Sequence, residues 1–64
     1  MRIDWTTITT DQAKRLVGVA RRAENIATER ARHDDSDASL EAMMSAYTVW
    51  ENLQVFILTG ERPD

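Results

Sequence analysis

The residues most capable of chemistry lie around the single histidine, His33, and the acidic stretch that follows it. Asp34, Asp35 and Asp37 could ligate a cation, but the stretch lacks the glycine and the distal glutamate of a calcium loop. His33 falls at the end of a predicted helix, where Glu29 lies one turn earlier and the helix dipole favours a positive charge. Capping and solvation account for these side chains, so we predict no catalytic residue, no metal ligand, no cofactor and no enzymatic activity.

Basic residues on the same predicted helix suggest a second kind of chemistry, the binding of phosphates. Lys14, Arg21 and Arg32 lie near one line of the helix, and Arg22 lies further round. Such a row could follow a nucleic-acid backbone. The net charge is −3, however, and no aromatic residue of this helix could stack on a base. Binding of RNA or DNA is therefore kept as an alternative to the first hypothesis.

The composition limits how the chain can be stabilised. With 64 residues and no cysteine, it can form neither a disulfide framework nor a thiolate zinc site. A core this small seldom supplies enough stability alone, which leaves oligomerisation as the remaining aid. Residues 1–33 carry a charge of +3 and residues 34–64 carry −6, so the two halves should attract each other. The first ten residues do not resemble a signal peptide and no segment is apolar enough to span a membrane, so we expect a cytoplasmic protein.

Hydrophobic periodicity predicts an all-α fold in a single domain, an antiparallel helical hairpin with an extended N-terminal arm. Thr9 and Gln12 fit a capping box at the start of the first helix, and Gly60 suits the end of the second. Small residues, mainly alanine, form the apolar stripe of the first helix, and Val19 and Ile26 widen it on one side. The predicted elements are an arm over residues 1–9, helices over 10–33 and 37–59, a turn over 34–36, and a tail over 60–64.

The second predicted helix is apolar around about two-thirds of its circumference, which is more than one neighbouring helix can cover. We therefore predict a homodimer in the form of a four-helix bundle, with the second helices central. Trp5 of the arm either closes one end of the core or anchors a protein partner. The residues predicted to bind the second copy or a partner are Leu40, Met43, Met44, Tyr47, Trp50, Leu53, Phe56, Ile57 and Trp5.

Residues 3–14, IDWTTITTDQAK, resemble a short segment of some phage tail and tail-fibre proteins, in which an Ile-Asp-Trp stretch precedes a Thr-capped helix. In layout the predicted fold is similar to the Rop-type dimer of αα-hairpins, which binds RNA. The first resemblance implies a phage or prophage origin. The resulting hypothesis is a small phage-encoded protein that sequesters or inhibits a protein of its bacterial host. The alternatives are a Rop-like nucleic-acid-binding dimer and a component of the virion or of its assembly.

Overall fold

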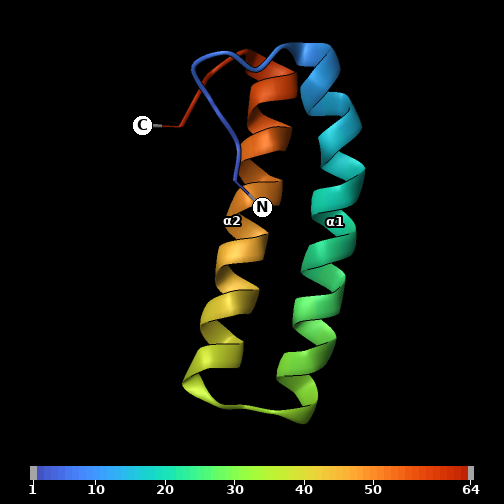
Figure 1. The fold of residues 1–64 in the computed structure, drawn as a ribbon, viewed down its shortest axis with the longest axis vertical. Coiled ribbons are helices and arrows are strands. Elements are labelled where there is room, and N and C mark those ends of the chain that lie inside the picture. The colour runs from blue at the N-terminus through green and yellow to red at the C-terminus, as the bar shows by residue number, and fades with distance from the viewer. Residues whose placement is uncertain (1, 64) are drawn as a thin grey trace.

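The computed structural model describes residues 2–63 and confirms the all-α helical hairpin. Helix α1 spans Thr10–His33 and helix α2 spans Asp37–Thr59, and the two run antiparallel with a short turn between them (Figure 1). Both helix bounds coincide with the predicted ranges, and the described residues contain no strand. The hairpin is 36 Å long, which is the length of 24 helical residues at about 1.5 Å per residue.

Local side-chain chemistry fixes where each helix begins and ends. The Thr9 hydroxyl accepts a hydrogen bond from the Gln12 backbone N–H at 3.2 Å, and the Gln12 side chain accepts one from the Thr9 N–H at 3.0 Å. This is the predicted capping box, which satisfies two donors at the helix start. At the end of α2, Gly60 has a φ of 77°, a left-handed conformation, and its N–H donates to the Phe56 carbonyl at 2.8 Å.

The turn between the helices is organised by the Asp34 carboxylate. Asp34 accepts hydrogen bonds from the Ser36 backbone N–H at 3.2 Å and from the Ser39 hydroxyl at 3.0 Å. Ser36 in turn caps α2 by accepting from the Ser39 N–H at 3.3 Å. These bonds hold the pKa of Asp34 below its usual 3.8, the Ser39 hydroxyl being the largest cause and the Ser36 N–H the next.

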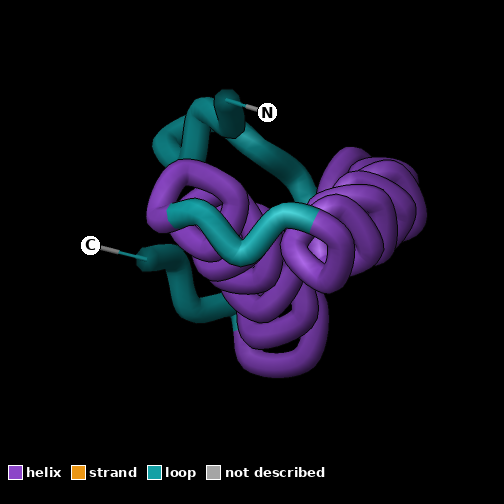
Figure 2. The backbone as a smooth tube through the Cα atoms, turned by 90° about the horizontal axis from the view of Figure 1, so that it is seen from below, coloured by secondary structure: helices purple, strands orange, loops and turns teal. Residues whose placement is uncertain are grey.

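The core lies toward the end of the hairpin where α1 begins and α2 ends. Its buried members are Ala13 and Ala20 of α1, Leu53 and Phe56 of α2, and Ile8. The turn lies at the other end of the molecule, in the foreground of the view along the helices (Figure 2). Near the turn the buried residues are small ones, so large side chains hold together only one half of the hairpin.

The N-terminal segment is not the extended arm that the sequence predicts. Residues 5–7 form a turn in which the Asp4 carboxylate accepts from the Thr6 N–H at 3.1 Å and from the Thr6 hydroxyl at 2.6 Å. Because the Asp4 carboxylate bonds the Thr6 backbone N–H, the chain turns here instead of continuing in an extended conformation. The bend lets Ile3, Trp5 and Ile8 pack on the helices instead of remaining in solvent. The segment therefore closes the open end of the hairpin.

Arg62, which sequence analysis did not single out, ties the two ends of the chain together. Its Nε donates to the Trp5 carbonyl at 2.6 Å and its Nη2 donates to the Ile8 carbonyl at 3.1 Å. The guanidinium carbon also lies 5.0 Å from the centre of the Phe56 ring, whose other neighbour is Trp5 in an edge-on contact at 6.1 Å. A planar, forked donor can serve two carbonyls at once, and few other side chains can.

We expect Arg62→Ala to lower the free energy of unfolding by about 1–2 kcal/mol, because two backbone carbonyls lose a charged donor. Urea denaturation followed by circular dichroism would measure this loss. Arg62→Lys is the matched control, since it keeps the charge but not the fork, and it should recover only part of the stability. A full recovery by lysine would show that charge alone matters at this position.

Ser39→Ala should raise the pKa of Asp34 toward its usual value, because it removes the hydrogen bond that lowers this pKa most. A pKa that is lowered in the folded chain contributes stability above the unfolded pKa, and this stability is lost as the pH falls through the folded pKa. The variant should therefore show a weaker dependence of stability on pH below about 4. NMR titration of the Asp34 carboxyl would measure the shift, with Asp4, whose pKa Thr6 lowers, as an internal control.

Candidate interaction surface

Most of the large apolar side chains that remain exposed form a row along α2. Its members are Leu40, Met44, Tyr47, Val55 and Leu58, with Met44 exposed by 65% and Leu58 by 79%. At about 100° of helix per residue, they fall within roughly a quarter of the circumference of α2. We call this row the outer face of α2. Between Leu40 and Leu58 the only charged residue in that arc is Glu51.

The structure separates the residues predicted to bind a partner into three groups. Leu53 and Phe56 cannot contact a partner as predicted, because they are buried in the core of the hairpin itself. Trp5 is half-buried, with its ring against Phe56. Met43, Trp50 and Ile57 are also half-buried. Leu40, Met44 and Tyr47 form the third group and are exposed on the outer face. Val55 and Leu58 were missing from the predicted set, although a helical wheel places them in the same arc.

The narrow packing surface of α1 explains why α2 stays uncovered. All the buried residues of α1 are alanines, Ala13, Ala20 and Ala31. Alanine allows the helix backbones to approach closely, but it presents little surface to a neighbour. Val19 and Ile26, which were expected to widen this stripe, are instead exposed by 51% and 57%. They face the side of α1 that α2 does not reach.

A groove of about 390 Å³ runs between the helices next to the outer face. Met43, Met44 and Tyr47 line it from α2, and Glu24 and Thr28 line it from α1. Methionine is flexible and polarisable, so such a lining can adapt to the shape of a bound group. The Glu24 side chain is only 14% exposed and accepts a hydrogen bond from the Thr28 hydroxyl at 3.4 Å. We call this the methionine groove.

Tyr47, which lines the methionine groove, also belongs to an aromatic pair. The rings of Tyr47 and Trp50 lie 5.8 Å apart, and the Arg21 guanidinium carbon lies 4.5 Å from the centre of the Trp50 ring. Arg21 Nη1 is also 3.7 Å from a carboxylate oxygen of Glu24. A cation that stacks on tryptophan and faces a carboxylate is held in one orientation. This arrangement crosses from α1 to α2 and fixes the edge of the groove that Tyr47 lines.

The basic residues predicted to contact phosphates are exposed, but two of the four already face acidic side chains. Arg21 is engaged by Glu24, and Arg32 Nη1 lies 3.4 Å from Glu29. Lys14 and Arg22 have no ion pair within the described residues. The row is therefore a mixed surface in which glutamates alternate with the basic groups, and this weakens its positive potential.

The residues around the histidine are engaged with one another as the sequence predicts. His33 Nε2 lies 3.1 Å from Glu29 Oε1, and Asp34 caps the turn. Within residues 2–63, no three side chains of the metal-binding types converge on one point.

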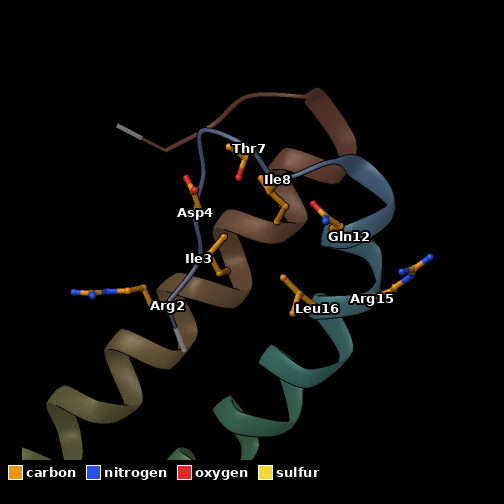
Figure 3. Close-up of a pocket in the computed structure, with 8 residues that line it drawn as sticks. All are labelled: Arg2, Ile3, Asp4, Thr7, Ile8, Gln12, Arg15 and Leu16. Atoms are coloured by element: carbon orange, nitrogen blue, oxygen red, sulfur yellow. The ribbon is translucent and has the colours of Figure 1, made fainter.

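Two further hollows accompany the methionine groove. One, of about 390 Å³, lies between the N-terminal segment and α1, where Ile3, Ile8 and Leu16 point toward one another and the Arg2 and Arg15 side chains point away (Figure 3). The other, of about 300 Å³, lies between the helices and is lined by small residues such as Ala23, Ala42 and Ser45. No described buried side-chain polar atom lacks a hydrogen-bond partner.

The chain matches no known protein family, no curated protein and no solved structure. Neither of the two helices in the described part of the chain is long and apolar enough to cross a membrane. The geometry thus defines a helical hairpin with an exposed apolar helix face.

Leu53 and Leu58 offer a direct comparison of core and surface within one helix, because Leu53 is 0% exposed. Leu53→Ala should lower the free energy of unfolding by about 2–5 kcal/mol, the range for a truncated core leucine. Leu58→Ala should change it by less than about 0.5 kcal/mol at high dilution, where nothing covers the outer face. Urea denaturation at low protein concentration tests both. Equal losses for the two variants would contradict the assignment of Leu58 to an open surface.

Proposed function

We propose that this protein is a small, non-enzymatic, phage-encoded protein that binds a protein of its bacterial host in the cytoplasm and so sequesters or inhibits it. The observation that carries the proposal is the outer face of α2. Five large apolar side chains in this row remain exposed even though α1 and the segments that flank the helices pack against α2. Contiguous apolar surface of this kind marks a site of protein association.

The composition of the outer face also favours protein binding. Tyrosine and methionine are enriched in the centres of protein interfaces, and charged residues are depleted there. Tyr47 and Met44 lie in the middle of the row, with Glu51 as the one charged neighbour. An amphipathic helix from a partner would place its apolar residues at three- and four-residue steps along such a face. The adjoining methionine groove would adjust to the partner's side chains.

In the absence of a host partner, the face is covered by a second copy of the chain. A four-helix bundle with the α2 helices central buries both outer faces at once and adds the core volume that the alanines of α1 do not supply. Host binding then exchanges one copy for a helix of the host protein. Dimerisation and inhibition therefore depend on the same residues.

Met44→Glu tests the proposal, because it places a charge in the middle of the outer face. The wild-type chain should sediment at twice its mass of 7.3 kDa at micromolar concentration, and Met44→Glu should sediment as a monomer. Asn25→Glu is the matched control: it adds the same charge at an exposed position of α1 and should leave the dimer intact. A wild-type chain that is folded and monomeric at this concentration would contradict the dimer.

Capture of host proteins from a lysate with the same three chains tests the inhibitory function. One host protein should be retained by the wild type and by Asn25→Glu but not by Met44→Glu. Retention of RNA or DNA that falls steeply with added salt would instead indicate phosphate contacts through Lys14, Arg21, Arg22 and Arg32. Recovery of the chain in purified phage particles would instead indicate a virion component.

A further inference from the structure

We infer that two copies of the chain pair antiparallel through the outer faces of α2, about a two-fold axis at the level of Val49 along the helix. The inference rests on the dimer proposed above and adds its orientation and register. It follows from the spacing of the residues along the outer face, which is symmetric about the position of Val49. Leu40 and Leu58 lie at equal distances from Val49 along the helix, and so do Tyr47 and Glu51.

Because they are equally spaced from Val49, the same residues are also symmetric in angle on a helical wheel. At about 100° per residue, Leu40 and Leu58 point in one direction, and Tyr47 and Glu51 lie about 20° to either side of it. A two-fold axis midway between the two α2 helices, perpendicular to that direction and to the helix axes, sets each of these residues at the same level as its counterpart in the second copy, as an isologous interface requires. The pairs are Leu40 with the partner's Leu58, Met44 with the partner's Gln54, and Tyr47 with the partner's Glu51.

The position of Glu51 selects this register over its neighbours. A shift that sets Met44 opposite the partner's Leu58 would bring Glu51 against its own copy, and two like charges in an apolar interface repel each other. A parallel arrangement does the same, because every residue then faces itself. In the register proposed here, the Tyr47 hydroxyl donates to the partner's Glu51, so the one carboxylate of the face gains a hydrogen-bond donor.

The arrangement also makes full use of the apolar surface. Each exposed leucine at an end of the face meets a leucine, and Val55 lies beside the partner's Met44. A shift by two turns in the other direction would place Leu40 against the partner's Glu51 and leave Leu58 beyond the start of the partner's α2. The proposed register is therefore the one that covers both ends of the row and separates the two charges.

Disulfide trapping tests the pairing, since the chain contains no cysteine of its own. Leu40→Cys and Leu58→Cys chains, mixed and oxidised with diamide, should form a mixed disulfide between the two variants. Leu40→Cys oxidised alone should stay largely monomeric on a denaturing gel, because its two copies would lie about 27 Å apart along the helix axis. Met44→Cys with Gln54→Cys should also cross-link, whereas Met44→Cys with Leu58→Cys should not.

Sedimentation of the same reduced variants separates the possible failures. Dimeric chains in which Leu40→Cys alone cross-links would overturn the antiparallel pairing and leave the dimer in place. Dimeric chains in which Met44→Cys pairs with Leu58→Cys would overturn only the register. If the reduced variants and the wild type all sediment as monomers, the proposed dimer falls, and the pairing falls with it.

Discussion

The close contact between an alanine-lined helix and a helix of large apolar residues determines the rest of this molecule. Ala13, Ala20 and Ala31 let α1 approach α2 closely, but they fill little volume. Only Leu53 and Phe56 among the large side chains of α2 are fully enclosed. A wider apolar stripe on α1 would have covered more of α2. The outer face of α2 is thus exposed because the buried residues of α1 are small.

The same shortage of core volume explains the role of the chain ends. The segment before α1 supplies Ile8 to the core and sets Trp5 edge-on to Phe56. Arg62 then fastens this segment by bonding to two of its carbonyls. Burial of these residues on the hairpin adds apolar contact where two helices alone could not. The terminal segments therefore act as a third layer over one end of the fold.

The helices could be predicted from sequence because their signals are local. The Thr9–Gln12 capping box, the Ser36 cap and Gly60 act within one turn of the helix ends that they define, and periodicity located the apolar arc of α2. The conformation of the N-terminal segment could not be predicted in this way. β-branched residues favour an extended chain there, but Asp4 bends it, and contacts with distant residues of α2 and with Arg62 hold the bend. Tertiary contacts override local propensity at this point.

The division of the candidate site into core and surface was likewise only partly predictable. A helical wheel shows which residues share a face, but not how far a neighbouring helix reaches round it. Leu53 and Phe56 are covered by the neighbouring elements and are buried, whereas Val55 and Leu58 are not covered and remain exposed. For Val19 and Ile26 the pattern was misleading, because alanines adjacent to them on α1 make the contact with α2 instead. That choice depends on the distance between the helix axes, which sequence alone does not give.

The uneven distribution of the core has a consequence for the motions of the hairpin. Large side chains, the N-terminal turn and Arg62 clamp one end, whereas the end with the connecting turn is held by alanines and by the hydrogen bonds of Asp34 and Ser39. Local opening starts where fewest apolar contacts must be broken, so amide hydrogens should exchange fastest near the connecting turn. Met43 and Glu24 lie in this looser half. Opening of the helices from the turn end would therefore widen the methionine groove while the clamped end stays closed.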